Sequence, residues 1–240
     1  MFSLKNRKKK KQLMLSKLPR NLITVSDSKS IISEQFRTIR TNITFSMPDQ
    51  ELKTILVTSS TPGEGKSTNA ANLGVVFAQE GKKVLIIDGD LRKPTLHQTF
   101  KTFNKVGLSN VISKKATYKE AVQETFIFGL YVLTSGPIPP NPAELLASKS
   151  MDVLIGDVKR DFDIIIIDAP PLLSVSDAQI LANKCDGTVL IVNTGVVEKE
   201  AVRKAKAILS NSQSIIIGVV LNNYIMPKHQ HYYYEYSFGE

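Results

Sequence analysis

The chain has 240 residues, of which 42% are hydrophobic, and it carries a formal net charge of +9 at pH 7. This length suits one large α/β domain or two small ones. The single cysteine, Cys185, excludes an internal disulfide framework and any metal or iron–sulfur site built from paired cysteines, and it fits a reducing compartment. No run of about eighteen apolar residues occurs, so the sequence predicts no membrane-spanning helix.

Positive charge is concentrated at the N-terminus, where Lys5, Arg7 and the four lysines of residues 8–11 lie close together. Such a run is typical of a solvated, mobile arm, and attraction to anionic lipid or to an acidic protein surface is the functional alternative. No nucleic-acid-binding motif accompanies it, so no nucleic-acid partner is expected. We therefore expect residues 1–27 to form a basic arm and linker.

A helix with a serine cap is predicted over residues 28–45, and its apolar residues form one packing face. Glu34, Arg37 and Arg40 recur every three residues and share a second face. That face is either ordinary solvated surface or a contact surface for a neighbouring subunit, because guanidinium groups and a carboxylate can form geometry-specific pairs.

Residues 54–72 read TILVTSSTPGEGKSTNAAN, which predicts a buried strand, a glycine-rich turn and a helix over residues 66–79. The turn lets backbone N–H groups point inward, toward the positive end of the following helix. Lys66 adds a charge and Ser67 a hydroxyl suited to Mg²⁺. The pattern departs from G-x-x-x-x-G-K-[ST] at its first position, where Ser60 replaces glycine. The residues expected to hold the nucleotide phosphates are Pro62, Gly63, Glu64, Gly65, Lys66, Ser67 and Thr68.

Strands and helices alternate through the rest of the chain. The alternation predicts one doubly wound α/β domain with a mainly parallel sheet over residues 28–223. The further strands are expected at 83–88, 129–134, 162–168, 187–193 and 215–221; the further helices are expected as short turns up to about residue 125, and at 143–147, 151–159, 176–184 and 198–209.

Acidic residues follow two of these strands: Asp88 and Asp90 come at the end of one, and Asp168 ends another. Ligands bind beyond the carboxyl ends of such strands, so these side chains are expected to converge on the phosphate loop. Mg²⁺ would be held by Ser67 and, directly or through water, by Asp168 and Asp88. Asp90 would accept a proton from an incoming hydroxyl or position a water. Arg92 is a candidate contact to phosphate or to a neighbouring subunit.

Four of the seven tyrosines, Tyr232, Tyr233, Tyr234 and Tyr236, lie in the last nine residues. They follow the last expected strand and show no apolar period. A partly docked aromatic tail and a phosphoacceptor tail both fit this pattern, and a phosphoryl-transfer site on the same chain favours the second. We therefore expect residues 224–240 to form a flexible, tyrosine-rich tail.

In combination, these motifs resemble the bacterial tyrosine kinases (BY-kinases) of the capsular-polysaccharide type found in Gram-positive bacteria. TPGEGKST matches Walker A, LIIDGDLR matches Walker A′ and IIIIDAPP matches Walker B, while E-x-x-R-x-x-R matches Glu34, Arg37 and Arg40. The resemblance covers the chain from about residue 28 to its end. It implies a P-loop NTPase fold of the deviant Walker A type and a non-specific protein-tyrosine kinase that uses ATP and Mg²⁺.

The resemblance also implies roles for site residues. Lys66 and its loop would hold the ATP phosphates, and Ser67 would bind Mg²⁺. Asp88, Asp90 and Asp168 would bind the metal and activate the tyrosine hydroxyl.

The partners implied by the resemblance begin with further copies of the chain. Glu34, Arg37 and Arg40 would build a ring-shaped homo-oligomer, in which each tail is phosphorylated in trans by a neighbour and the ring then disassembles. A transmembrane activator of the polysaccharide co-polymerase type would complete the nucleotide site and hold the cytoplasmic kinase at the inner face of the membrane. The implied process is capsular or exopolysaccharide synthesis, with nucleotide-sugar enzymes as further substrates.

A partition or cell-division-site ATPase, which is a nucleotide-switched binding protein, is the competing class on this scaffold. That class carries a second lysine early in the phosphate loop, where this chain has Thr61. Its members also tend to end in a membrane-seeking helix or to use a DNA-binding surface, whereas this chain ends in tyrosines. An iron–sulfur scaffold ATPase would need cysteines that are absent here. The kinase interpretation is therefore favoured.

Overall fold

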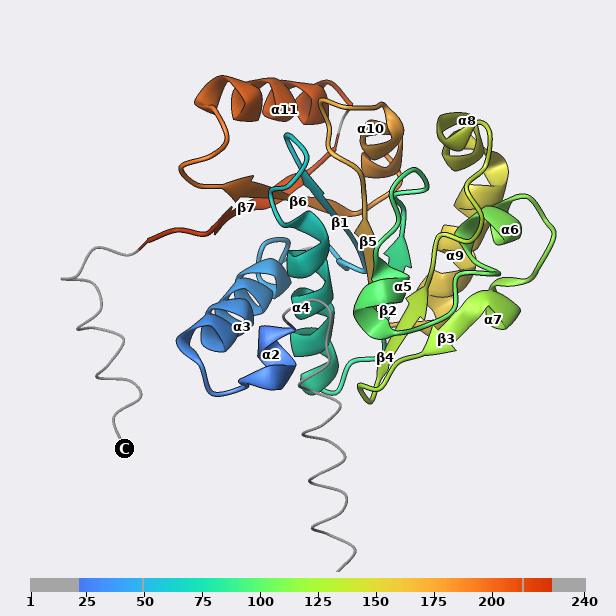
Figure 1. Cartoon of the computed structure of the whole chain (residues 1–240), viewed down its shortest axis with the longest axis horizontal. Coiled ribbons are helices and arrows are strands. Elements are labelled where there is room, and N and C mark those ends of the chain that lie inside the picture. The colour runs from blue at the N-terminus through green and yellow to red at the C-terminus, as the bar shows by residue number, and fades with distance from the viewer. Residues whose placement is uncertain (1–21, 49, 213, 226–240) are drawn as a thin grey trace, which may run out of the picture.

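The computed structural model of the chain describes residues 22–48, 50–212 and 214–225. Its core is a seven-stranded sheet with the strand order β3-β4-β2-β5-β1-β6-β7 (Figure 1). The pairing of β3 with β4 is antiparallel, and every other pairing in the described sheet is parallel. The predicted doubly wound, mainly parallel α/β fold is confirmed. The strands are β1 (Thr54–Ser59), β2 (Val84–Asp88), β3 (Val122–Glu124), β4 (Leu130–Leu133), β5 (Ile164–Asp168), β6 (Gly187–Asn193) and β7 (Ile216–Asn222).

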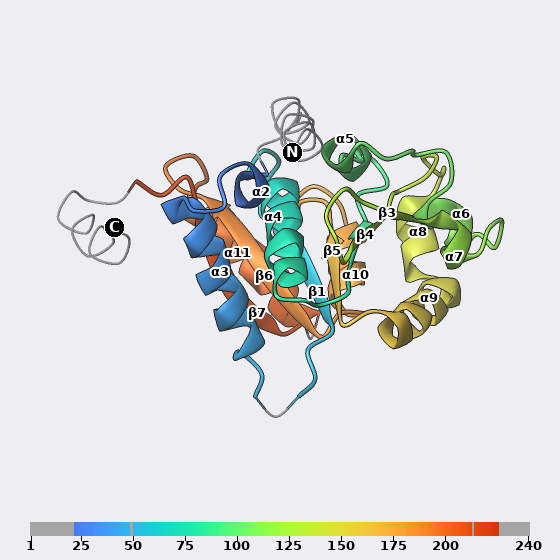
Figure 2. The ribbon, with the colours of Figure 1, turned by 90° about the horizontal axis from the view of Figure 1, so that it is seen from below.

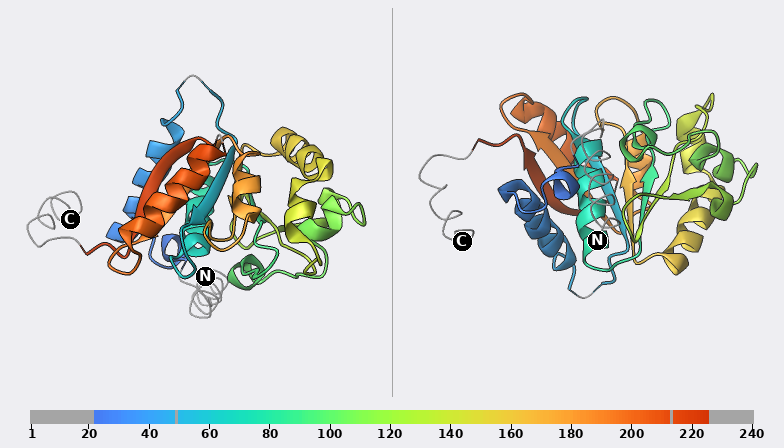
Figure 3. Two further views of the ribbon diagram at one scale, coloured as in Figure 1. Left: turned by 90° about the horizontal axis from the view of Figure 1, so that it is seen from above. Right: turned by 60° about the horizontal axis from the view of Figure 1, so that its bottom comes forward.

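Helices cover both faces of the sheet, with α3 and α4 on one face and α10 and α11 on the other (Figures 2 and 3). None of the described helices is long and apolar enough to cross a membrane. The helices are α2 (Ile23–Ser26), α3 (Ile31–Thr44), α4 (Lys66–Gln79), α5 (Leu96–Phe100), α6 (Leu108–Ile112), α7 (Tyr118–Ala121), α8 (Pro142–Ala147), α9 (Lys149–Asp161), α10 (Asp177–Ala182) and α11 (Lys199–Asn211).

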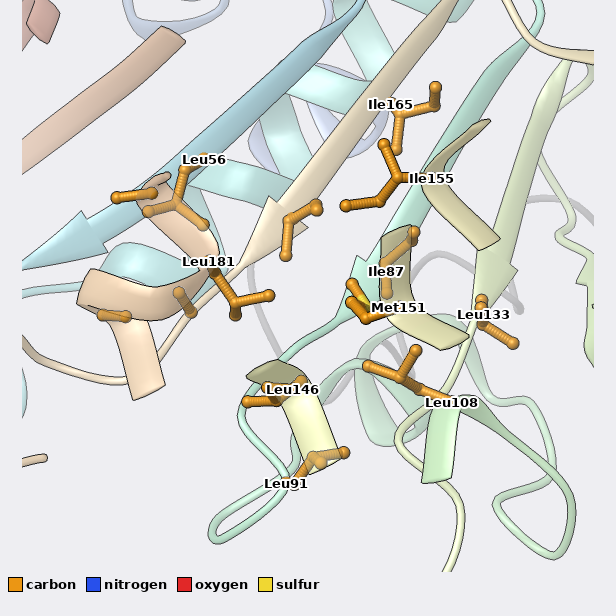
Figure 4. Close-up of a cluster of buried hydrophobic side chains, with 14 of the residues drawn as sticks. Leu56, Ile87, Leu91, Leu108, Leu133, Leu146, Met151, Ile155, Ile165 and Leu181 are labelled. Carbon is orange, nitrogen blue, oxygen red and sulfur yellow. The ribbon is translucent and has the colours of Figure 1, made fainter. Parts of the chain in front are cut away.

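Alternate residues of the central strands point into two separate cores. Leu56, Ile87 and Ile165 face a cluster that includes side chains of α8, α9 and α10 (Figure 4). Their neighbours Ile55 and Ile86 face the second cluster, beneath α3 and α4. All five are fully buried. Because each such side chain contributes about 1.5–3 kcal/mol when buried, the central strands form a rigid platform for the loops at their carboxyl ends.

Two elements were not predicted from the sequence. Strand β3 lies in a segment expected to hold only short helices, and three residues are too few to show an alternating pattern. Helix α2 lies within residues 1–27, which were expected to form an arm and linker. Leu22 is 1% exposed, and the N–H and hydroxyl of Thr24 donate to Oδ1 of Asn72 at 3.1 and 2.8 Å. The packed region therefore begins ahead of the expected boundary at residue 28.

Candidate active site

The phosphate loop joins β1 to α4 at the carboxyl edge of the sheet. Gly63 and Gly65 adopt left-handed backbone angles, with φ of +84° and +89°, a region that costs a residue with a Cβ about 1–2 kcal/mol. Gly65 is also the N-cap of α4, so the helix N-terminus opens directly on the loop. A cleft of about 400 Å³ lies here, and it is lined by Pro62, Gly63, Gly65, Lys66, Ser67, Thr68, Asp90, Arg92, Lys93, Thr95, Pro170, Pro171, Ser174 and Val175.

Lys66 lies at the centre of the predicted catalytic set. Its Nζ is 3.2 Å from Oδ2 of Asp90 and 3.6 Å from Oδ1 of Asp168, and it donates to Oγ of Ser67 at 3.3 Å. Burial opposes the charge of Lys66, but the carboxylates of Asp168, Asp90 and Asp88 outweigh it and the pKa of Lys66 is raised. Lys66 is therefore a cation at neutral pH.

Asp88 and Asp168 are register partners at the ends of β2 and β5, and both are fully buried. Oδ2 of Asp88 accepts the backbone N–H groups of Thr95 and Leu96 at 3.0 and 2.9 Å. Within the described residues, Oδ1 of Asp88 and both carboxylate oxygens of Asp168 accept no hydrogen bond. Burial, with the charge of Asp168 added to it, raises the pKa of Asp88 to about 7, and burial likewise raises the pKa of Asp168.

This arrangement fits a hydrated Mg²⁺ ion. Magnesium typically takes one or two carboxylates, several waters and substrate phosphates rather than an all-protein cage. The part of the chain that the structure describes contains no group of three or more His, Cys, Asp or Glu side chains placed to hold a metal. Buried carboxylate oxygens without hydrogen bonds are what such an ion would satisfy. The side chains that fit it are Ser67, Asp88 and Asp168.

Asp90 lies between the buried pair and the cleft, and it is 5% exposed. Its Oδ1 accepts the backbone N–H of Lys93 at 2.9 Å, while Oδ2 faces Lys66. Asp90 lines the cleft, and Asp88 and Asp168 do not. Of the three carboxylates, Asp90 is therefore the one that a group bound in the cleft can reach directly.

Asp177, to which the sequence assigned no role, fixes the side chain of Arg92. Nε and Nη2 of Arg92 donate to Oδ2 and Oδ1 of Asp177 at 2.9 and 3.0 Å, and Asp177 is fully buried at the start of α10. This bidentate pair is the strongest hydrogen-bonding mode of arginine. It holds the guanidinium group at the cleft wall, and no sequence pattern relates two residues that lie 85 positions apart.

The three charged residues of α3 have different environments. Arg37 pairs with Glu34 at the surface. Arg40 instead reaches α4, where its Nη1 donates to the carbonyl oxygen of Val76 at 3.1 Å and its Nε is 3.6 Å from Glu80. The three residues share a face, but Arg40 also holds α3 against α4 of the same chain. The four tail tyrosines predicted as phosphoacceptors lie outside the described residues.

Comparison with known proteins gives the family. A family model described as an AAA domain matches residues 52–216. Tyrosine-protein kinase YwqD of Bacillus subtilis is 52% identical over 219 residues, which cover 91% of this chain and 92% of the relative. The chain belongs to the bacterial tyrosine-kinase family. Putative tyrosine-protein kinase CapB of Staphylococcus aureus is 45% identical over 209 residues, or 87% and 92% of the two chains.

Solved structures agree with this assignment. The chimerical protein CapA2B2 superimposes with a TM-score of 0.82 at 45% identity, over 86% of this chain and 90% of that one. The septum site-determining protein MinD of Pyrococcus horikoshii, complexed with Mg-ADP, reaches 0.63 at 25% identity over 74% and 75%. The kinase domain of Escherichia coli tyrosine kinase ETK superimposes with a TM-score of 0.80 at 30% identity, over 86% of this chain and 82% of that one, so it too is closer than MinD. The protein is a tyrosine-protein kinase with an ATP-binding P-loop fold.

Proposed function

We propose that this kinase uses ATP and Mg²⁺ to phosphorylate Tyr232, Tyr233, Tyr234 and Tyr236 of a neighbouring copy, in trans. The observation that carries the proposal is the convergence of Lys66 with Asp90 and Asp168, at 3.2 and 3.6 Å, beside buried carboxylate oxygens without hydrogen bonds. The catalytic domain expected over residues 28–223 also includes the packed segment from Leu22 to Ser26, and the proposed acceptor tail spans residues 224–240.

The chain's own residues supply positioning and charge. The N–H groups of the phosphate loop and the Lys66 cation bind the phosphates, with the N-terminus of α4 behind them. Ser67, Asp88 and Asp168 would hold Mg²⁺, and the bound ion would neutralise the charge that develops on the transferred phosphoryl group. Asp90 accepts the proton of the attacking tyrosine hydroxyl while the bond between the γ-phosphorus and the ADP oxygen breaks, so that phosphotyrosine and ADP are formed.

We further propose a role in capsular or exopolysaccharide synthesis. Similarity to CapB and to the chimerical protein CapA2B2 supports a transmembrane activator of the polysaccharide co-polymerase type as partner, which would keep the kinase at the inner face of the membrane. Ring assembly through Glu34, Arg37 and Arg40 and transfer to other proteins, such as nucleotide-sugar enzymes, belong to the same proposal.

Replacing Lys66 tests the site. Lys66→Met removes the only side-chain cation within 4 Å of Asp90 and Asp168 among the described residues. We expect phosphotyrosine formation to fall at least about a hundredfold, because a preorganised charge at the phosphates is worth roughly 3 kcal/mol or more. The measurement is anti-phosphotyrosine detection after incubation with ATP and Mg²⁺, with and without the activator's cytoplasmic segment. Persistent labelling of the variant would show that the site is misassigned.

Replacing the tail tyrosines tests the acceptor. With Tyr232, Tyr233, Tyr234 and Tyr236 all changed to Phe, we expect most autophosphorylation to disappear while transfer to an added protein substrate continues, since the nucleotide site is untouched. Mixing this variant with Lys66→Met protein should restore the label, and only on the Lys66→Met chain, if transfer occurs in trans. Label that stays on the four-Phe chain would mean that the acceptor tyrosines lie elsewhere.

A further inference from the structure

Glu64 is a buried carboxylate inside the phosphate loop, and it is 2% exposed. Its Oε1 accepts the backbone N–H of Thr61 at 2.6 Å and the Thr61 hydroxyl at 3.1 Å. Its Oε2 accepts the backbone N–H of Asn193, at the end of β6, at 3.0 Å. Burying a charged carboxylate is unfavourable unless hydrogen bonds compensate, and here they come from Thr61 within the loop and from Asn193 of β6.

Asn222 holds the same loop from β7. Its Nδ2 donates to the carbonyl oxygen of Glu64 at 2.9 Å. Asn222 also packs so closely on Gly65 that a Cβ at that position would lie 2.3 Å from Nδ2. Asn193 and Asn222 are register partners, so both contacts come from one corner of the sheet. The loop is thus fastened to the carboxyl ends of two strands that contribute none of the predicted catalytic residues.

Glu64 acts from behind the loop rather than on the nucleotide. Pro62, Gly63, Gly65 and Lys66 line the cleft, and Glu64 does not. Both of its carboxylate oxygens are engaged by N–H groups of the protein. The sequence predicted Glu64 as part of the phosphate-binding loop, but the structure turns its carboxylate away from the cleft.

We infer that Glu64 and Asn222 form a clamp that holds the phosphate loop open against β6 and β7, and that Glu64 is a positioning residue for ATP. This inference rests on the nucleotide site proposed above. A loop that is already ordered does not lose conformational freedom when ATP binds, so the clamp increases affinity through preorganisation. Loosening the clamp weakens the binding of ATP in the ground state and the transition state alike, which raises KM and leaves kcat nearly unchanged.

Glu64→Gln tests the clamp with almost no change in size. One oxygen becomes an amide that faces a backbone N–H group, so one hydrogen bond to a charged acceptor is lost. We expect the KM for ATP and the Kd for ADP, measured by calorimetry, to rise about tenfold or more, with kcat at saturating ATP within about twofold of the wild type. Glu120→Gln is the matched control, because Glu120 also accepts the N–H and hydroxyl of a threonine three residues earlier, in α7. It should leave KM and Kd unchanged.

Asn222→Ala tests the second residue of the clamp, and the result does not depend on whether the Glu64 variant folds. It should weaken ADP binding severalfold, and the double variant should bind hardly worse than the weaker single variant, because both residues hold one loop. ADP affinity that is unchanged in folded Glu64→Gln or Asn222→Ala protein would overturn the clamp. An equal loss of kcat and thermal stability without a change in affinity would overturn it as well. Lys66→Met is measured in parallel: if it also leaves ADP binding intact, the nucleotide site itself is wrong.

Discussion

Asp88 and Asp168 lie side by side at the ends of two buried strands, where their negative charges destabilise the folded state. Each is fully buried, and together they leave three oxygens without hydrogen bonds within the described residues. Lys66 offsets part of this charge, since it is 3.6 Å from Asp168. The site thus stores unfavourable electrostatic free energy that a bound cation would release, which is the usual conflict between stability and activity.

This conflict gives a pH-dependent prediction for Asp88→Asn. The pKa of Asp88 is raised from 3.8 to about 7 in the folded protein. The folded state therefore binds the Asp88 proton more tightly than the unfolded state does. The protonated carboxyl makes its full contribution to the free energy of unfolding below about pH 4, and this contribution is lost as the pH rises through about 7. Asparagine resembles the protonated form. In EDTA at pH 8 we expect Asp88→Asn to be more stable than the wild type by about 1–3 kcal/mol.

Thermal unfolding at two pH values checks this expectation. At pH 8 the melting temperature of Asp88→Asn should be higher by about 2–4 °C for each kcal/mol. At pH 5 the difference should shrink, because the folded wild type is then protonated at Asp88. Added Mg²⁺ and ADP should reverse the order, since the wild type gains more from the ligand. A variant that is less stable than the wild type in EDTA at both pH values would contradict the electrostatic account.

At the scale of elements, the sequence predicted well the helices and strands that have strong local patterns. It predicted poorly the elements and contacts that depend on residues far away in the chain. Helix α4 and strand β5 carry strong local signals, the glycine-rich turn before α4 and the continuous apolar run of β5, and they lie within two residues of the predicted bounds. Strand β3 and helix α2 are short and gain their order from neighbours, so no local pattern marks them. The clamp at Glu64 was also missed, because its partner Asn193 is 129 residues away.

Helix α2 depends on one buried amide in α4, which gives a second prediction. Oδ1 of Asn72 accepts both the N–H and the hydroxyl of Thr24, and all three groups are buried. Asn72→Ala leaves two buried donors without this acceptor, so we expect a loss of about 2–4 kcal/mol in the free energy of unfolding in urea. Amide exchange should become faster over residues 23–26.

Gln79→Ala is the control for this prediction. Gln79 also holds α2, through one hydrogen bond from Nε2 to the carbonyl oxygen of Thr24 at 3.0 Å, but its side chain lies in an exposed position. Water can replace that bond, so its loss should cost less than about 1 kcal/mol. Equal effects of the two substitutions would mean that α2 is held by apolar packing of residues such as Leu22 rather than by Asn72.

At the scale of the whole molecule, strand order accounts for the site. Because β2, β5 and β1 are neighbours in the sheet, the ends of three strands that are far apart in the chain meet at one edge. Sequence position predicted that Asp88, Asp168 and Lys66 would converge, since all follow parallel strands. It did not predict that Asp88 and Asp168 are direct register partners, because register depends on the packing of side chains on both faces.

The charged face of α3 is the proposed contact between copies, and the contacts of its three residues decide which variant tests it. Because Arg40 also contacts Val76 and Glu80 of the same chain, replacing it would disturb the packing of α3 as well as any contact between copies. Glu34→Ala with Arg37→Ala disturbs the chain less, because Arg37 bonds outside the pair to the exposed carbonyl oxygen of Ser28, at 2.6 Å, and not to another helix. This surface pair is partly exposed, so its loss should cost at most about 1 kcal/mol of stability. If α3 forms the contact between copies, light scattering should show a shift from oligomer to monomer.

The matched control for this double variant is a second pair with the same spacing, Glu200 and Arg203 on α11, whose charged groups are 3.8 Å apart. Glu200→Ala with Arg203→Ala removes equal charge from another surface and should leave the oligomer intact. An oligomer that survives loss of the α3 pair, with the protein folded, would make that face ordinary solvated surface. A shift to monomer with both variants would point instead to a general effect of surface charge, which salt would screen over about 10 Å at 0.1 M.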